Sequence, residues 1–449
     1  MNWSDKAYAR FLLFVGGLGG FLYGIDVGTI AVAQPYLKDL DVYSSSQLGF
    51  IVSGVLAGGI IASLLAGVLC NRFGRKKMIV VSAALFILSI PVLCLSRDSF
   101  AVMMTGRLVE GLGLGFLAVA MPMYLAECLP ADLRGRGSGL FQLFLSISMV
   151  TAAGAGVLIS FVFGAADAAG EGWNKAIAWR VDFLWTLVPA TALFICSLFL
   201  KESPVWLALR KGSGQAQNAK GDVASAPRPA GGSLLQRKYV LPFVLTLLVL
   251  TLNKTIGSNI VLSYAVDMFQ RSGLTGAIGN LGDMALKGVN LAVTLLAVGL
   301  VDRKGRKWLL KAGTAGLTLG LLLIGGMFLA FEHGILEPSR LAGFITLGAF
   351  LAFQAFYSLG PALCVWLVLS ELMPTRIRAN GMAIALFSNQ LVAWGLSAAF
   401  PAIGKAVGFG PLFLIFAVSG VLYFITVLFI PETKGKTLEE LEHLFDRPE

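Results

Sequence analysis

Charged side chains are scarce in this sequence. Asp, Glu, Lys and Arg make up 13% of the 449 residues, whereas soluble globular proteins carry about 25%. Hydrophobic residues make up 57%, and the mean hydropathy is +0.80. A chain so poor in charge lacks the side chains that cover a water-exposed surface. The composition therefore excludes an ordinary soluble enzyme and predicts a multi-span membrane protein.

Histidine and cysteine are also scarce. The chain has two histidines, His333 and His443, and five cysteines, none of them in a CxxC pair. The histidines fall in a loop and in the tail, and the cysteines lie in or beside apolar stretches, where free cysteine behaves as a small hydrophobic residue. These absences argue against a zinc site, a disulfide framework and histidine-based catalysis. We expect no enzymatic activity, no bound metal and no cofactor.

The apolar residues are grouped into stretches long enough to cross a membrane, which takes about 20 residues in a helix. Twelve such stretches lie near residues 11–34, 47–69, 78–96, 101–126, 138–164, 177–200, 240–270, 281–300, 308–331, 341–370, 380–406 and 409–430. The predicted fold class is therefore an all-α membrane protein with twelve transmembrane helices.

The distribution of basic residues predicts the orientation of the chain. The formal net charge is +10, and most Lys and Arg residues lie in the loops that follow even-numbered spans. Because loops rich in Lys and Arg stay in the cytoplasm, we expect both termini on the cytoplasmic side. Basic clusters of this kind indicate membrane topology and no nucleic-acid partner. Short termini and outer loops favour a bacterial inner membrane.

A polar segment divides the spans into two sets. Residues Lys211–Ser233 are rich in Gly, Ala, Ser and Pro and lack apolar periodicity, as expected of a linker. The predicted organisation has an N-terminal six-helix half at 1–200, a cytosolic linker at 201–238, a C-terminal six-helix half at 239–430 and a cytosolic tail at 431–449.

The two halves repeat three short signatures in the same order. The matching pairs are Arg72–Lys76 with Arg303–Lys307, Glu127–Arg134 with Glu371–Arg378, and Glu202 with Glu432. An ordered repeat of this kind indicates a duplicated six-span unit. Duplicated halves that enclose a substrate site near the middle of the membrane are typical of secondary transporters.

The repeated charged residues predict a cytosolic gate. Arginines at helix ends can pair with glutamates and close the cytosolic side, and breaking those pairs would open it. The alternative is that the basic residues only set the topology, but topology requires no glutamates, so we favour a gate. The predicted gate residues are Arg75, Glu127, Arg134, Glu202, Arg306, Glu371, Arg378 and Glu432.

Further motifs are Gly106–Arg107, Pro122–Glu127 (PMYLAE), Glu202–Leu207 (ESPVWL) and Pro431–Thr437 (PETKGKT). With the repeated RxGRK loop, they make the chain resemble the sugar porter family of the major facilitator superfamily over essentially its whole length. The last two motifs are specific to sugar porters, whereas the RxGRK loop occurs across the superfamily. The resemblance implies the major facilitator fold and a monosaccharide carrier that works by alternating access.

The resemblance also implies which residues bind the sugar, between the halves and mostly on the C-terminal one. Amides suit sugar hydroxyls because they both donate and accept hydrogen bonds, and an indole offers a surface to an apolar sugar face. Taken singly, an amide could instead join two helices and a tryptophan could anchor the membrane interface. The predicted sugar-binding residues are Gln142, Asn253, Lys254, Asn259, Asn290, Trp366 and Asn389.

Lys254 departs from the family pattern. Sugar porters carry a Gln-Gln pair at the position where this chain has Asn253 and Lys254. Placing a charged side chain inside a span costs free energy, so such a residue usually has a function. Lys254 could bind a substrate carboxylate, could pair with Asp267 or another internal anion, or could extend to the membrane interface. The sequence leaves these three alternatives open.

Asp26 and Arg107 are isolated charges in the apolar first and fourth spans. Their positions match those at which proton-coupled sugar porters keep an Asp–Arg pair. Burial favours the protonated form of an aspartate and a nearby arginine favours the ionised form, so a pair whose separation changes between states would take up and release a proton. The alternatives are a static ion pair, or Glu110 as the partner of Arg107, one helical turn away.

The predicted function is a proton-coupled symporter for a hexose or pentose. Its partners would be the monosaccharide, the proton and the lipid membrane, and we expect a monomer. One alternative is a proton-coupled carrier of an acidic sugar or small organic anion bound through Lys254, and another is a facilitative sugar uniporter. A nutrient receptor with this fold would need a longer cytosolic tail than Pro431–Glu449.

Overall fold

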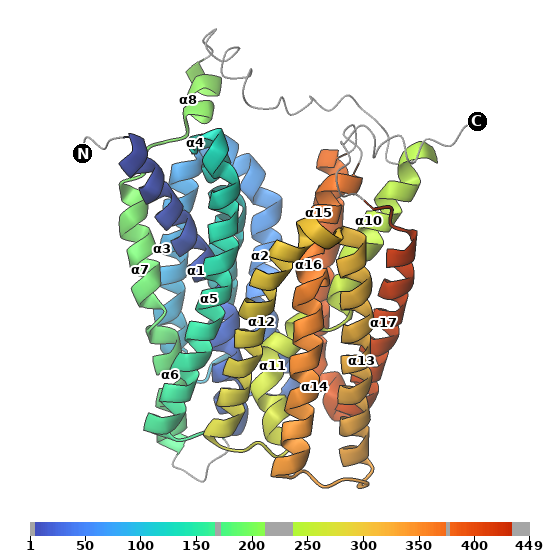
Figure 1. Cartoon of the computed structure of the whole chain (residues 1–449). Helices are drawn as coiled ribbons and strands as arrows, with labels where there is room; N and C mark the ends of the chain where they lie inside the picture. The colour runs from blue at the N-terminus through green and yellow to red at the C-terminus, as the bar shows by residue number, and fades with distance from the viewer. Residues whose placement is uncertain (1–4, 167–171, 212–236, 374–377, 433–449) are drawn as a thin grey trace. The chain divides into compact units, whose positions relative to one another are not determined.

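The computed structural model describes residues 5–166, 172–211, 237–373 and 378–432, and these ranges contain helices and connecting turns without a β-strand (Figure 1). The chain divides into two compact units, Met1–Ala226 and Pro227–Glu449. The division falls inside the segment expected to be the linker.

The N-terminal unit holds seven long helices and one short helix in its described residues. They are α1 (Asp5–Asp39), α2 (Ser45–Phe73), α3 (Arg75–Cys94), α4 (Phe100–Cys128), α5 (Ala131–Phe163), α6 (Gly172–Leu184), α7 (Leu187–Leu198) and α8 (Pro204–Lys211). The short helix α8 lies in the segment expected to be linker. It begins there because the Ser203 hydroxyl accepts a hydrogen bond from the Trp206 backbone N–H at 3.2 Å, a common way to start a helix.

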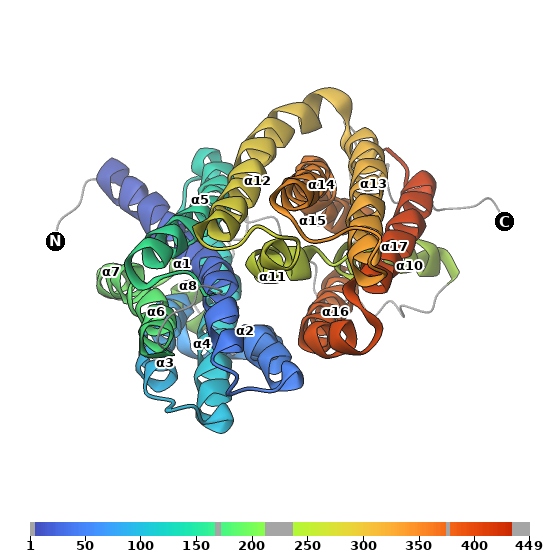
Figure 2. The same cartoon turned by 90° about the horizontal axis from the view of Figure 1, so that it is seen from below.

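The C-terminal unit continues with a second set of helices. They are α10 (Arg237–Thr255), α11 (Ser258–Arg271), α12 (Ala277–Lys304), α13 (Arg306–Glu332), α14 (Arg340–Leu359), α15 (Pro361–Leu372), α16 (Arg378–Val407) and α17 (Phe409–Phe429). Seen from below, α11 lies among α12, α14 and α16 (Figure 2).

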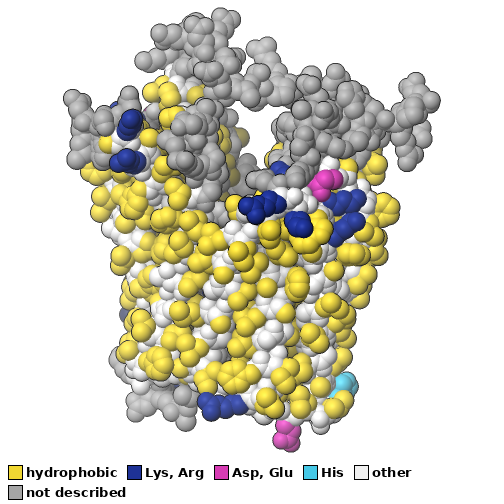
Figure 3. Space-filling model, in the orientation of Figure 1, with side chains coloured by type: hydrophobic (Ala, Val, Ile, Leu, Met, Phe, Trp, Pro, Cys, Tyr) yellow, Lys and Arg dark blue, Asp and Glu magenta, His cyan; other side chains and the backbone are white. Residues whose placement is uncertain are grey.

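The helices confirm the expected all-helical membrane protein. Eleven stretches of the described residues are long and apolar enough to cross a membrane, and the remaining expected span coincides with α16. Hydrophobic side chains cover the sides of the helices, while basic side chains lie near their ends (Figure 3). Apolar side chains therefore face outward along the spans, as a lipid environment requires.

Three expected spans are interrupted rather than continuous. The sixth divides into α6 and α7, the seventh into α10 and α11, and the tenth into α14 and α15. The seventh breaks at Gly257, whose φ of +77° is a left-handed conformation that glycine adopts without strain. The tenth breaks at Gly360, where an added Cβ would lie 2.1 Å from the Leu309 carbonyl oxygen, and Pro361 follows without an N–H to continue the helix.

Gly257→Ala is expected to destabilise the protein by about 1 to 3 kcal/mol, because a non-glycine residue at this φ is strained and its Cβ would lie 2.7 Å from the Phe416 ring. The thermal unfolding midpoint of the protein purified in detergent checks this. The matched control is Gly326→Ala in α13, where an added Cβ meets nothing within 4 Å, so no loss is expected. Equal midpoints for the two variants would contradict the prediction.

Candidate functional site

The N-terminal unit buries a three-residue charge cluster. The Arg107 Nη1 of α4 lies 2.5 Å from Asp26 Oδ1 of α1 and 2.8 Å from Glu110 Oε2, one turn along α4. Arg107 is fully buried, and the two carboxylates are at most 5% exposed. The sequence left open which carboxylate is the partner of Arg107. In the structure one guanidinium nitrogen binds both.

Close packing of α2 against α4 holds the guanidinium in place. Its Nε donates to the Ile51 carbonyl at 3.1 Å and its Nη2 to the Val52 carbonyl at 3.4 Å. Glycines of α2 allow this approach, because a Cβ on Gly54 would lie 2.8 Å from Arg107 Cβ and one on Gly58 would lie 2.4 Å from the Leu108 carbonyl oxygen. These contacts hold the Arg107 side chain against α2 in this structure, and its two carboxylate partners set the local charge.

The charge balance of the cluster suits the binding of one proton. With both carboxylates ionised, one guanidinium faces two negative charges, so the cluster is negative in an apolar surrounding. Binding one proton makes it neutral, and burial favours the neutral form.

Among the described residues, no group of three or more His, Cys, Asp or Glu side chains could hold a metal ion.

The break between α10 and α11 carries three of the predicted sugar-binding residues. The Asn253 Nδ2 donates to the Pro361 carbonyl at 3.2 Å, which joins the break of the seventh span to that of the tenth. The Lys254 Nζ donates to Asn259 Oδ1 at 2.9 Å, across the break. Asn253 is buried, whereas Lys254 and Asn259 are partly exposed.

A second group of polar side chains joins α12 to α14. The Asn290 Oδ1 accepts hydrogen bonds from Gln354 Nε2 at 3.1 Å and from Ser358 Oγ at 2.7 Å. The Gln354 Oε1 is buried and has no hydrogen-bond partner among the described residues. Sequence reasoning singled out Asn290 and missed Gln354 and Ser358. Their i, i+4 spacing in the tenth span was the available signal.

Three predicted sugar-binding residues remain, and the structure describes the side chains of two of them. Asn389 of α16 is buried, and its Nδ2 donates to the Leu250 carbonyl of α10 at 2.7 Å. Gln142 lies exposed on α5 of the N-terminal unit. Trp366 falls within α15, but its side chain lies outside the described residues.

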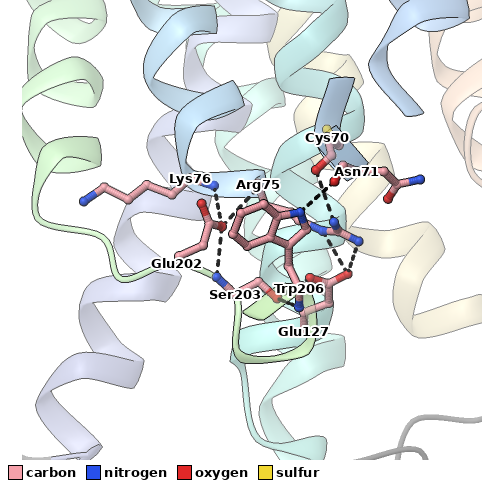
Figure 4. Close-up of polar contacts among 8 residues, drawn as sticks. All are labelled: Cys70, Asn71, Arg75, Lys76, Glu127, Glu202, Ser203 and Trp206. Atoms are coloured by element: carbon pink, nitrogen blue, oxygen red, sulfur yellow. Dashed lines mark hydrogen bonds and ion pairs between the residues drawn. The ribbon is translucent and has the colours of Figure 1, made fainter. Parts of the chain in front are cut away.

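Three of the predicted gate residues of the N-terminal unit, Arg75, Glu127 and Glu202, form a polar cluster (Figure 4). Glu202 Oε1 accepts hydrogen bonds from the Arg75 and Lys76 backbone N–H groups, both at 3.0 Å, so a distant carboxylate caps the first turn of α3. The Arg75 Nη2 pairs with Glu127 Oε1 at 2.9 Å. Ser203 Oγ donates to the same Glu127 side chain.

The C-terminal unit repeats this helix cap. Glu432 accepts hydrogen bonds from the Arg306 and Lys307 backbone N–H groups, both at 3.1 Å, at the start of α13. Gly74 and Gly305 precede the capped turns with φ of +98° and +88°. We call Glu202 and Glu432, with the backbone N–H groups they bind, the carboxylate caps. The side chains of Arg134, Glu371 and Arg378 lie outside the described residues.

Comparison with known proteins identifies the family. The model for "Sugar (and other) transporter" matches residues 12–445. The arabinose-proton symporter of Bacillus subtilis is 31% identical, over 96% of this chain and 93% of its own. The chain belongs to the sugar porter family. The xylose transporter XylE of E. coli, a member of known structure, superposes with a TM-score of 0.80 at 26% identity, over 97% of this chain and 100% of its own.

Sugar porters named for different substrates are similarly related to this chain. The glucose transporter GlcP of Staphylococcus epidermidis is 30% identical over 97% of each chain, close to the value for the arabinose-proton symporter. Membership of the sugar porter family makes the chain a membrane transporter and not an enzyme. Overall identity does not select the sugar, so the substrate must be argued from the site.

Proposed function

We propose that this sugar porter is a proton-coupled symporter for a monosaccharide, working by alternating access. The observation that carries the proposal is the buried cluster of Asp26, Arg107 and Glu110, in which one cation faces two carboxylates. A carboxylate without full compensation inside a membrane protein is costly, and uptake of one proton removes that cost. A facilitative carrier needs no such group.

The sugar is bound by the amide groups beside the breaks of the seventh and tenth spans. Asn253, Asn259, Asn290 and Asn389 supply donors and acceptors for hydroxyls, and Gln142 and Trp366 complete the proposed set. The gate residues close the cytosolic side in one state and open it in the other. The contacts that support this are the Arg75–Glu127 pair and the carboxylate caps, each within one unit.

The proposal also includes the orientation of the chain, the membrane that holds it and its oligomeric state. Both termini lie in the cytoplasm, the membrane is a bacterial inner membrane, and the chain acts as a monomer. The relatives named above come from bacteria, and basic residues gather in the loops assigned to the cytoplasm.

Uptake into proteoliposomes tests the proposal. The purified full chain is reconstituted, an acidic outer pH is imposed, and labelled pentoses and hexoses are supplied one at a time. With one proton per sugar, a gradient of one pH unit supports accumulation of about tenfold, and a proton ionophore abolishes it. A sugar that enters only to equal concentrations, whatever the pH gradient, would show a uniporter and overturn the proton coupling.

A further inference from the structure

Lys254 is a cation inside a span, and no anionic side chain among the described residues forms an ion pair with it. Its Nζ binds the neutral Asn259 Oδ1 at 2.9 Å. Moving an ammonium group out of water costs free energy unless an anion or several acceptors compensate it. One neutral oxygen compensates it only in part.

Two other basic side chains of the same unit have their charge compensated by an aspartate. Lys287 lies 2.6 Å from Asp283, with both side chains fully buried, and Arg271 lies 2.9 Å from Asp267. Asp267, a possible partner of Lys254 on the sequence, therefore binds Arg271 instead. Nor does Lys254 extend to the membrane interface, because its Nζ stays at the break between α10 and α11.

The backbone at this place presents helix N-termini beside helix C-termini, because α10 and α14 end at the breaks where α11 and α15 begin. Helices α11 and α15 both begin at the breaks, and neither first turn is capped by a side chain. The Asn253–Pro361 hydrogen bond of 3.2 Å brings the two breaks together. Helix N-termini carry partial positive charge and expose backbone N–H groups, and in broken transporter helices they point at anionic substrate groups.

We propose that Lys254 binds the carboxylate of an acidic monosaccharide, such as a hexuronate. The amides of Asn253 and Asn259 would bind its hydroxyls, and Lys254 would exchange the Asn259 oxygen for the substrate carboxylate. This inference rests on the proposed transport function. The relatives described above are named for the neutral sugars arabinose, glucose and xylose, so the substrate charge is where this chain departs from them.

The test measures binding of matched sugar pairs to the purified full chain. The pairs are D-glucose with D-glucuronate and D-galactose with D-galacturonate. Binding is measured as the rise in the thermal unfolding midpoint that each ligand causes. For at least one pair, the wild type is expected to bind the uronate at least about tenfold more tightly than the neutral sugar. The reason is that hydrogen bonds to charged groups contribute more free energy than hydrogen bonds between neutral groups.

Variants assign that preference to Lys254. Lys254→Gln is expected to weaken uronate binding by roughly 10- to 100-fold and to leave neutral-sugar binding within about threefold. Lys254→Arg keeps the charge and is expected to bind uronate better than Lys254→Gln. Lys405→Gln, which removes an exposed lysine from α16 of the same unit, serves as the control and is expected to change neither. The ligand-free unfolding midpoint shows whether each variant is folded.

Three results would overturn the inference. A neutral sugar that stabilises the wild type while both uronates are silent overturns it and leaves the proposed sugar transport intact. Uronate binding that survives Lys254→Gln unchanged places the carboxylate elsewhere. If neither class binds and neither moves protons into proteoliposomes, the proposed function itself fails. The wild-type preference decides the question even if Lys254→Gln does not fold.

Discussion

Asp26→Asn is expected to abolish proton-driven sugar accumulation while leaving sugar exchange intact. The amide cannot take up and release a proton, but it fills the same space beside Arg107. Arg107 also keeps its 2.8 Å pair with Glu110 and its two backbone carbonyls on α2, so the fold survives. With a gradient of one pH unit, we expect the accumulation ratio to fall from about 10 to about 1. Proteoliposome uptake measures the loss, and counterflow of labelled sugar measures the exchange that remains.

Glu110→Gln is the companion variant in that experiment. It removes the other carboxylate of the cluster and leaves the 2.5 Å contact between Arg107 and Asp26. The cluster of this variant holds one carboxylate and one guanidinium and is already neutral, so accumulation is expected to fall, as it does in Asp26→Asn. If Asp26→Asn accumulates sugar like the wild type, Asp26 does not carry the proton. Loss of accumulation in Glu110→Gln alone would assign the proton to Glu110.

Removing both carboxylate caps is expected to cost roughly 4 kcal/mol of stability. Each glutamate caps the first turn of a helix through two backbone N–H groups, and losing a helix cap together with its charge costs about 2 kcal/mol. The two sites lie in different units, so the losses in Glu202→Ala and Glu432→Ala should add. Thermal unfolding of the single and double variants in detergent measures the effect.

Glutamine at the same positions separates hydrogen bonding from charge. Glu202→Gln and Glu432→Gln keep an acceptor oxygen for the backbone N–H groups, so they are expected to lose about half as much as the alanine variants. If the alanine variants unfold at the wild-type midpoint, the caps contribute nothing to stability. In that case the repeated glutamates would serve only the opening and closing of the cytosolic side.

Hydrophobic runs were sufficient to predict the spans, because a helix that crosses lipid must be predominantly apolar over about 20 residues. They could not predict that the seventh and tenth spans are broken. Gly257 does not differ in sequence from the many glycines that sit inside unbroken helices here. What sets it apart is a left-handed φ, which depends on packing. Gly360 is followed by Pro361, and this sequence signal for a break was missed.

The repeated charged motifs were recognised in the sequence, and the Arg75–Glu127 pair is a contact of the expected kind. The backbone contacts were not foreseen: Glu202 and Glu432 accept hydrogen bonds from backbone N–H groups of the RxGRK loops. Every residue except proline has a backbone N–H group, so the residue types of a motif do not show that a backbone group will be the partner. Similarly, Gln354 escaped notice because its importance comes from Asn290 on another helix.

The binding of a substrate carboxylate at Lys254 has a bioenergetic consequence. A neutral sugar that enters with one proton carries one positive charge inward, so the membrane voltage drives it by about 2.3 kcal/mol per 100 mV. An acidic sugar that enters with one proton carries no net charge. Its uptake would be electroneutral, driven by the pH difference and by its own concentration gradient alone. A cell whose membrane is depolarised but whose exterior is acidic could still accumulate it.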